Sequence, residues 1–429
     1  MQTYDCIGGS EMLDRDFYVR IRKRLADEME DNSFYFVHSG SEVESTNDEC
    51  YLFEPYRNFL YLVGLEVPDA VLLITKVSGK VSETLFMHMP TARETMYTGS
   101  VVNEEYVKSV TGIETIADEH TWTDRISRLM FNGVVQTAYM DVARWRMNYP
   151  HNGEQKLAEE LKDAYPFLNL RNMYPVVAKF RTVKEKEEIE AHRKAAAITN
   201  EAVRNMLRNM KPGMTESAIE AYYDFVLKSN GVKVPAFTTI AASGPNNNTL
   251  HYSKNDRVTE DGDLILFDLG AQVDRYCTDV SRTYPVNGKY TERQKQLYNC
   301  VLEGLKAAEA LSRPGQKKGE LQEISKKVMA EELIKVGKIS KPEEIDQYYF
   351  HGSGHFIGLN THDVGDTGDT ILEKDMMFTL EPGLYFKDEG FGFRIEDTIL
   401  ITEDGCDVLS GVIPKEIDEI EAYMAEFNR

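Results

Sequence analysis

Residues 262–279 read GDLILFDLGAQVDRYCTD. The apolar run at positions 264–267 predicts a buried β-strand that ends directly in a carboxylate, Asp268. Gly270 and the polar residues after it indicate a turn, and a second carboxylate, Asp279, follows eleven positions after the first. A strand, a turn and a returning strand form an antiparallel pair. The stretch therefore predicts a β-hairpin that carries two acids on one face near its middle.

A second stretch, residues 375–397, repeats this pattern as DMMFTLEPGLYFKDEGFGFRIED. Here an apolar run ends in Glu381, and Glu396 follows fifteen positions later. Both stretches contain a strand, a carboxylate, one further residue and a glycine, followed by a return strand and a second carboxylate. The repetition predicts a second acidic hairpin and indicates a duplicated half-domain.

A glycine-rich segment with three histidines lies between the two predicted hairpins. Residues 351–362 read HGSGHFIGLNTH. Histidines four positions apart also occur by chance on helices, so the spacing alone is weak evidence of function. The glycines, however, argue against a regular helix and favour a bent backbone that brings side chains close to a ligand. His251, in an earlier stretch rich in glycine and asparagine, has similar neighbours.

The four acids and one histidine of these segments predict a metal centre. A carboxylate at the end of an apolar strand is partly buried, and four such groups cannot converge without compensation. They either ionise against cations or take strongly raised pKa values. Four carboxylates with one imidazole fit a pair of divalent ions better than one structural zinc, which prefers Cys and His. Two ions about 3.5–4 Å apart would hold a bridging hydroxide and stabilise a tetrahedral intermediate. Taken singly, each acid is equally consistent with an ordinary turn or ion-pair residue.

Composition and charge exclude several classes of partner. The 429 residues include 49 Lys and Arg against 71 Asp and Glu, so the formal net charge is −22. Nucleic acids and anionic membranes need a basic surface, which this chain lacks. No apolar run reaches the ~18–20 residues of a membrane span, and the N-terminus shows no export signal. The five cysteines include no CxxC pair. We therefore expect a soluble protein of a reducing compartment, the cytoplasm.

The periodicity of the chain predicts two domains, residues 1–178 and residues 179–429. In the first, residues 14–30 have the pattern of a helix. Four short β-rich runs are bounded by turn residues, namely residues 34–37, 59–63, 70–75 and 84–88. Alternating helix and strand signals of this kind predict a small α/β domain.

The start of the second domain has a different pattern. Residues 172–184 predict a short extended stretch. A highly charged helix is expected next, over residues 185–210, and it ends at a Lys-Pro-Gly sequence. A further helix is expected over residues 216–230. The second domain, with about 250 residues, is at the upper end of the usual size range for one domain.

These segments together resemble the pita-bread metallopeptidases, in the branch that contains aminopeptidase P and prolidase. In the second domain the resemblance is carried by TIAASGPNNNTLHY (239–252), DVSRTYP (279–285), HGSGHFIGL (351–359), TLEPGLY (379–385) and FRIED (393–397). In the first domain, residues 50–74, CYLFEPYRNFLYLVGLEVPDAVLLI, resemble the N-terminal domain of aminopeptidase P, more in pattern than in diagnostic residues. The resemblance covers nearly the whole chain.

The resemblance implies an α/β fold of the α+β type. A smaller α/β domain would precede a pita-bread catalytic domain, made of duplicated half-domains whose antiparallel sheet is covered by helices. It also implies two divalent metal ions, usually Mn²⁺, with Co²⁺ or Zn²⁺ as alternatives. Asp279 and Glu396 would bridge the two ions, Asp268 would bind one ion, and His355 with Glu381 would bind the other.

The resemblance also implies roles for the residues around the metals. Glu381 would act as the proton shuttle. His251, His351 and His362 would face the substrate, orient the peptide and stabilise charge on the scissile carbonyl. Arg394 would orient Glu396 or the substrate, and Tyr385 would lie at the edge of the site. The implied catalytic residues are thus Glu381, His251, His351, His362 and Arg394, and the implied substrate-binding residues are the three histidines, Tyr385 and Arg394.

The implied reaction is removal of an N-terminal residue that precedes proline. An Xaa–Pro bond is a tertiary amide without an N–H, so peptidases that bind substrate as a hydrogen-bonded strand handle it poorly. Prolidase, which cuts Xaa-Pro dipeptides with the same five ligands, is the main alternative, and the aminopeptidase P-like first domain favours longer peptides. Methionine aminopeptidase normally lacks such a domain. Creatinase-like hydrolases and non-catalytic peptide-binding modules of this fold lose metal ligands that this chain keeps. Family members are commonly homodimers or homotetramers.

Overall fold

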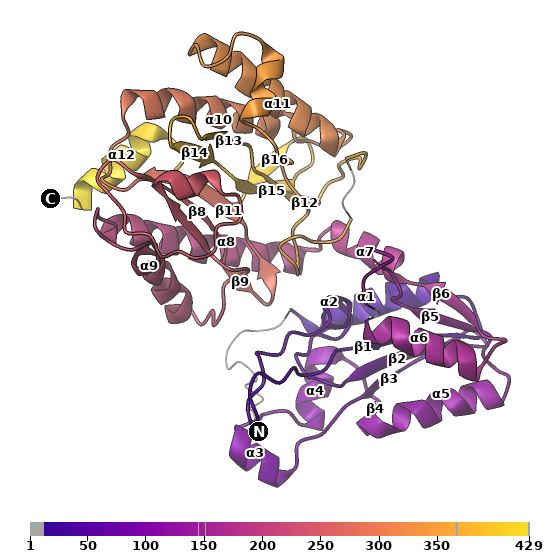
Figure 1. Cartoon of the computed structure of the whole chain (residues 1–429). Coiled ribbons are helices and arrows are strands. Elements are labelled where there is room, and N and C mark those ends of the chain that lie inside the picture. The colour runs from indigo at the N-terminus through magenta and orange to yellow at the C-terminus, as the bar shows by residue number, and fades with distance from the viewer. Residues whose placement is uncertain (1–12, 145, 151, 366–367, 428–429) are drawn as a thin grey trace. The chain divides into compact units, whose positions relative to one another are not determined.

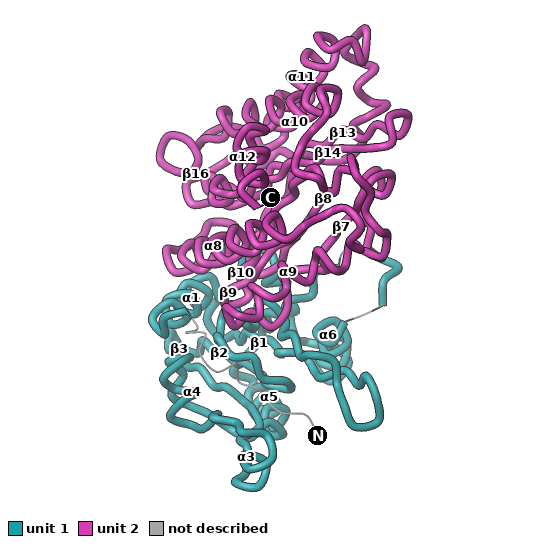
Figure 2. The backbone as a smooth tube through the Cα atoms, turned by 90° about the vertical axis from the view of Figure 1, so that its left-hand side faces the viewer, with its two compact units in different colours: residues 1–180 teal, residues 181–429 magenta. Residues whose placement is uncertain are grey.

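The computed structural model describes residues 13–144, 146–150, 152–365 and 368–427 (Figure 1). The chain forms two compact units, residues 1–180 and residues 181–429 (Figure 2). The division lies next to the boundary that the sequence predicts after residue 178. Cys6 and most of the N-terminal segment on which the expectation of no export signal rests lie outside the described residues.

The first unit is built on a six-stranded mixed sheet with the strand order β4-β3-β2-β1-β5-β6. Its strands are β1 (Ser33–His38), β2 (Val71–Val77), β3 (Lys80–Phe86), β4 (Ile116–Ala117), β5 (Thr137–Met140) and β6 (Asn169–Asn172). β1, β2 and β3 pair antiparallel, while β4, β5 and β6 pair parallel to their neighbours. The helices before and between these strands are α1 (Arg15–Glu28), α2 (Arg57–Val63), α3 (Ala92–Thr98), α4 (Glu104–Thr111), α5 (Trp122–Phe131) and α6 (Gly153–Ala164).

Two predictions for this part of the chain are wrong. Residues 59–63, predicted as a strand, belong to α2, because a short apolar run has the same pattern in a buried helix as in a buried strand. The helix ends at Gly64, whose φ of 78° is left-handed and whose Cβ would lie 2.4 Å from the Tyr18 ring. Residues 172–184, predicted as extended, contain helix α7 (Tyr174–Thr182). Asn172 caps the backbone N–H of Tyr174 at 3.1 Å, and proline is accommodated in the first turn of a helix.

The second unit contains two halves with the same order of elements. The first half has helices α8 (Lys186–Asn209) and α9 (Glu216–Ser229) followed by strands β7 (Ile240–Ser243), β8 (Leu264–Leu269), β9 (Gln272–Val273), β10 (Tyr276–Cys277) and β11 (Val280–Pro285). The second half has helices α10 (Glu292–Leu311) and α11 (Lys318–Lys335) followed by strands β12 (Met377–Leu380), β13 (Gly383–Phe386), β14 (Phe391–Arg394), β15 (Asp397–Ile401) and β16 (Cys406–Val408). Helix α12 (Ile417–Phe427) ends the unit. The predicted duplication and both predicted helices, α8 and α9, are confirmed.

Each half contains a three-stranded antiparallel sheet and a separate two-stranded hairpin. The three-stranded sheets have the orders β11-β8-β7 and β12-β15-β16, and the hairpins pair β9 with β10 and β13 with β14. Each predicted two-stranded hairpin is therefore part of a larger arrangement of five strands. The acid-bearing strands pair with each other, β8 with β11 and β12 with β15, and a smaller hairpin is inserted between them.

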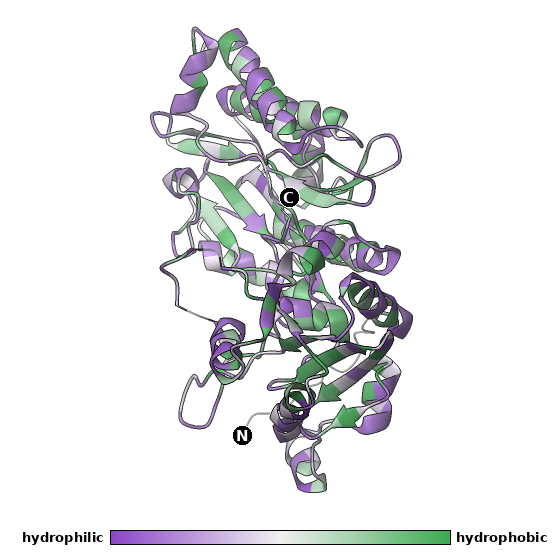
Figure 3. Cartoon of the chain, turned by 90° about the vertical axis from the view of Figure 1, so that its right-hand side faces the viewer, coloured by the Kyte–Doolittle hydropathy of each residue, from purple (hydrophilic) through white to green (hydrophobic). Residues whose placement is uncertain are grey.

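Apolar side chains fill the space between the strands and helices of this unit. Hydrophobic residues, in green, are frequent along the strands, while the helices carry many hydrophilic residues, in purple (Figure 3). Phe267 on β8, Leu297 on α10 and Phe378 on β12 are almost completely buried in one common core. This core holds the strand ends that carry the acids. No helix within the described residues is long and apolar enough to cross a membrane.

Candidate metal centre

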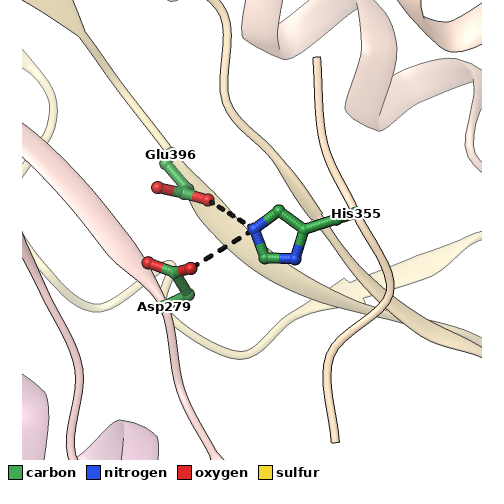
Figure 4. Close-up of side chains that lie close together, drawn as sticks. All are labelled: Asp279, His355 and Glu396. Carbon is green, nitrogen blue, oxygen red and sulfur yellow. Dashed lines mark ion pairs between the residues drawn. The ribbon is translucent and has the colours of Figure 1, made fainter. Parts of the chain in front are cut away.

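His355 lies beside two of the predicted metal-binding acids, Asp279 and Glu396 (Figure 4), and near a third, Glu381. Its Nε2 atom is 3.4 Å from Asp279 Oδ2, 4.0 Å from Glu396 Oε1 and 4.0 Å from Glu381 Oε1. Asp279, His355 and Glu396 each offer one ligand atom, and these atoms lie within 4.8 Å of one another. The spacing is suited to ligands that share a metal ion.

Asp268 completes the acidic group. It lies on β8, opposite Ser281 of β11 in the strand register, and Asp279 directly precedes β11. Burial raises the pKa of Asp279 well above its ordinary value, and the nearby charges of Asp268 and Glu381 raise it further. The structure thus brings together all five residues that the resemblance implies as metal ligands.

The two halves of the unit meet at this group. The Glu396 N–H donates to Ser281 O at 2.9 Å, and the Thr398 hydroxyl donates to Asp279 O at 2.8 Å. These bonds join the start of β11 to the start of β15. Each half therefore supplies two of the four carboxylates, and the contact between the halves brings the two pairs together.

The glycine-rich segment brings His355 against β12. The Thr379 N–H donates to His355 O at 2.8 Å, and the Glu381 N–H donates to Ser353 O at 2.9 Å. Gly354 has a φ of 148°, and a Cβ at this position would lie 1.8 Å from Thr379 O. Only glycine allows this close approach, so the predicted bent backbone is present.

The donor set fits divalent cations. Asp268 Oδ1, Asp279 Oδ1 and Glu396 Oε1 are buried and have no hydrogen-bond partner in the described part of the chain. Burial also raises the pKa of Glu396, and the nearby charges of Asp279 and Glu381 raise it further. Buried carboxylate oxygens without partners are costly unless a cation or a proton neutralises them. Carboxylates with one imidazole are ligands that such cations prefer.

A hydrogen-bonded chain extends from the acids to His351. Arg394 donates from Nη2 to Asp268 Oδ2 at 2.7 Å and from Nη1 to the Tyr385 hydroxyl at 3.1 Å. The Tyr385 hydroxyl lies 3.0 Å from His351 Nε2, and His351 Nδ1 lies 2.7 Å from Gly352 O. Because a carbonyl only accepts, Nδ1 carries the proton and Nε2 accepts from Tyr385. Burial lowers the pKa of His351 to about 4, so this imidazole is neutral.

Arg394 reaches Glu396 indirectly, through a residue that sequence reasoning missed. Its Nε donates to Ser281 Oγ at 2.7 Å, and Ser281 Oγ donates to Glu396 Oε2 at 2.9 Å. Ser281 lies two positions after Asp279 and thus on the same face of the strand, which is the signal in the sequence that points to it. The residues Thr379 and Thr398, which hold the ligand-bearing segments, were missed as well.

The remaining two histidines lie at the exposed side of the centre. The rings of His362 and His355 are 4.1 Å apart between centroids. Burial lowers the pKa of His362, and the charges of His355 and His251 lower it further, which places His251 nearby. Both His251 and His362 are exposed. All of the predicted site residues therefore surround one centre.

Comparison with known proteins places the chain in a family. Residues 190–403 match metallopeptidase family M24, and residues 18–136 match the aminopeptidase P N-terminal domain. The chain is 31% identical to the Xaa-Pro aminopeptidase of Escherichia coli (strain K12) over 96% of this chain and 98% of that protein.

Solved structures agree with this match over the whole length. A putative aminopeptidase P from Bacillus anthracis is 39% identical, with a TM-score of 0.94 over 96% of this chain and 99% of that one. Zinc-substituted E. coli aminopeptidase P in complex with product is 29% identical, with a TM-score of 0.88 over 98% of this chain and 100% of that one. The expected pita-bread domain after a smaller α/β domain is confirmed. The chain belongs to metallopeptidase family M24 and is a metallo-aminopeptidase with an aminopeptidase P N-terminal domain.

Proposed function

We propose that this enzyme hydrolyses the bond between the N-terminal residue and a following proline in peptides of three or more residues. The observation that carries the proposal is the convergence of Asp268, Asp279, His355, Glu381 and Glu396. Three of their buried carboxylate oxygens have no hydrogen-bond partner among the described residues. The similarity to an Xaa-Pro aminopeptidase over 96% of the chain, first domain included, supports the substrate class.

The five converging residues would hold two divalent ions. Asp279 and Glu396 lie on either side of the contact between the halves, which suits them to bridge both ions. Asp268 would bind one ion, and His355 with Glu381 the other. When bound, the ions would supply Lewis-acid polarisation of the scissile carbonyl and a water of lowered pKa. A set of four carboxylates and one imidazole favours Mn²⁺, with Co²⁺ and Zn²⁺ as further candidates.

Glu381 is the residue suited to move a proton. Its side chain is 22% exposed, in contrast to 2% for Glu396 and 5% for Asp279, so it can face both the metal centre and a substrate. Burial raises the pKa of Glu381, although the charge of His355 opposes this. A carboxylate with a raised pKa takes a proton from the attacking water more readily. It would then deliver that proton to the departing proline nitrogen.

The histidines and Arg394 would bind and orient the peptide. His351 is neutral and is fixed in one tautomer by Tyr385 and Gly352. His251 and His362, which are exposed beside the metal centre, are placed to donate hydrogen bonds to a peptide carbonyl and to charge that develops on it. Tyr385 contacts His351 directly, and Arg394 donates to the Tyr385 hydroxyl. The acidic centre would also attract the ammonium group of the substrate.

Cleavage of a tripeptide in comparison with a dipeptide tests this proposal. Protein loaded with Mn²⁺ should release the first residue from Xaa-Pro-Yaa. Cleavage of Xaa-Pro dipeptides alone would identify the enzyme as a prolidase. Loss of both activities after metal titration would favour a non-catalytic peptide-binding module.

We further propose that the enzyme works in the cytoplasm as a homodimer or homotetramer. Cys300 and Cys406 are free thiols in the described part of the chain, which suits a reducing compartment. Helix α3 presents Met96 and Tyr97, which are 82% and 61% exposed and offer an apolar surface for a subunit contact. Light scattering of the purified protein would give the number of subunits, and a monomer would contradict the proposed assembly.

A further inference from the structure

Asp363 directly follows His362 in the chain, and its side chain points away from solvent. The carboxylate is 1% exposed and forms an ion pair with Arg181, whose side chain is 3% exposed. Lys184, also 1% exposed, places Nζ 3.5 Å from Asp363 Oδ2. The Asp363 carboxylate therefore interacts with two buried cations. Although burial opposes its charge, Arg181 and Lys184 hold the pKa of Asp363 below its ordinary value.

The same residue closes the loop between the two neighbouring histidines. The Asp363 N–H donates to Phe356 O at 2.9 Å, which ties the residue after His362 to the residue after His355. A Cβ on Gly358 would lie 2.1 Å from Asp363 Oδ2 and 2.7 Å from Lys184 Nζ. The loop thus packs directly on the ion-paired group, with no space between them.

The two cations are themselves held in place. The Lys184 N–H donates to Asp375 O at 2.8 Å, and Val183 forms an isolated bridge with Met376, next to β12. β12 leads to Glu381, the proposed proton shuttle. The segment that carries Arg181 and Lys184 is therefore fixed to the strand that also positions the metal centre.

We propose that Asp363, held by Arg181 and Lys184, is a positioning residue that sets the place of the His362 ring beside His355. Without the carboxylate, the two buried cations would repel each other, and the loop would lose the group on which it packs. His362 would then leave its position 4.1 Å from the His355 ring. This inference rests on the proposed function, in which His362 faces the substrate.

A double-mutant cycle tests the inference. Asp363→Asn should lower kcat/KM for an Xaa-Pro-Yaa tripeptide about 10- to 100-fold, the usual effect of residues that orient a functional side chain. In a His362→Ala background the same substitution should cost less than about 2-fold, because the residue through which it acts is gone. An equal loss in both backgrounds would show a general effect on folding and would overturn the inference.

The control removes an equivalent carboxylate elsewhere in the same unit. Glu389 also holds one arginine and one lysine, with Arg293 at 2.9 Å and Lys338 at 2.6 Å. Glu389→Gln should leave kcat/KM within about 2-fold of the wild-type value. Should Asp363→Asn fail to fold, Lys184→Gln, which retains the ion pair of Asp363 with Arg181, replaces it in the cycle. A smaller loss of kcat/KM in the His362→Ala background would again support the inference, and an equal loss would overturn it.

A readout without substrate separates this inference from the proposed function. In a crystal structure of Asp363→Asn, or of Lys184→Gln in its place, the His362 ring should lie farther from His355 than 4.1 Å. An unmoved ring would overturn the inference. A wild-type enzyme that cleaves no tripeptide would contradict the proposed function, while the position of the ring would still decide the role of Asp363.

Discussion

Arg394 and Asp268 form a nearly buried ion pair that joins the two halves of the catalytic unit. Arg394 Nη2 lies 2.7 Å from Asp268 Oδ2, and the two side chains are 5% and 14% exposed. Asp268 lies on β8 of the first half and Arg394 on β14 of the second. The remaining donors of the guanidinium reach Tyr385 and Ser281. Arg394 therefore contacts the predicted metal ligand Asp268, the Ser281 hydroxyl that donates to Glu396, and the Tyr385 hydroxyl beside His351.

Replacement of Arg394 by lysine should reduce activity although the charge is retained. A single ammonium cannot donate to Asp268, Tyr385 and Ser281 at once, as the planar guanidinium does. We expect kcat/KM for an Xaa-Pro-Yaa tripeptide to fall about 10- to 100-fold. Arg293→Lys, which alters an arginine paired with Glu389, is the matched control and should have little effect. Full activity of Arg394→Lys would show that charge alone suffices.

Metal binding should stabilise the chelator-treated protein. Cations neutralise buried carboxylates that otherwise repel one another, and they bind only the folded site. At a hundredfold excess over Kd, Mn²⁺ should raise the melting temperature by about 5–10 °C. Glu396→Gln should show less than half of this rise. Glu421→Gln, which removes an acid paired with Lys295 at 3.0 Å, should show the full rise. Equal rises in the two variants would contradict the ligand assignment.

Glu216 anchors the loop that carries His251. Its carboxylate is fully buried. Oε1 accepts from the Ser243 N–H at 2.6 Å, and Oε2 accepts from the Tyr252 hydroxyl at 2.8 Å and from the Arg257 N–H at 3.0 Å. One side chain thus holds both ends of the segment between Ser243 and Arg257. Glu216 lies at the start of α9, before β7, so it is distant in sequence from the residues of the metal centre.

Glu216→Gln should therefore destabilise the protein and weaken substrate binding. The amide NH₂ cannot accept, so at least one buried donor loses its partner, at a cost of about 1–3 kcal/mol. We expect a lower midpoint in denaturant unfolding and a raised KM, because His251 is no longer held in place. Glu190→Gln, an exposed substitution on α8, should change neither quantity. An unchanged midpoint for Glu216→Gln would refute the role of this residue as an anchor.

Glu154 in the first unit should make stability depend on pH. Burial raises the pKa of its carboxyl to about 8, from an ordinary value of 4.5, although it accepts from the His38 N–H. Between these values the unfolded chain ionises while the folded chain keeps the proton, so stability falls as pH rises from about 4.5 to about 8. The loss is at most about 1.4 kcal/mol for each pH unit crossed. Glu154→Gln removes this loss.

Denaturant unfolding at pH 5 and pH 8 checks this prediction. The stability of Glu154→Gln relative to the wild type should be higher at pH 8 than at pH 5. Glu160→Gln, which removes an exposed acid of the same helix, should show no such difference. A relative stability of Glu154→Gln that is the same at both pH values would mean that Glu154 is ionised in the folded state throughout this range.

The sequence predicts the ligand-bearing strands better than the contacts that assemble them. Asp268 and Glu381 are identifiable because each ends an apolar run, which is a local signal. The pairing of β12 with β15 across an inner hairpin joins residues that are separated in sequence, and local patterns do not contain it. Ser281 was missed because its position after Asp279 does not reveal its contacts with Glu396 and Arg394 in the other half. The ion pair of Arg181 with Asp363 spans 182 residues, so no local pattern can reveal it.

The most direct test of the metal centre is the metal content of active protein. After loading with Mn²⁺ and removal of free ion, the wild-type chain should retain two ions and release the first residue from Xaa-Pro-Yaa. Glu381→Ala, which removes both a ligand and the proposed proton shuttle, should retain fewer ions and have no measurable turnover. A wild-type protein without bound metal at any loading, or an active Glu381→Ala variant, would contradict the account.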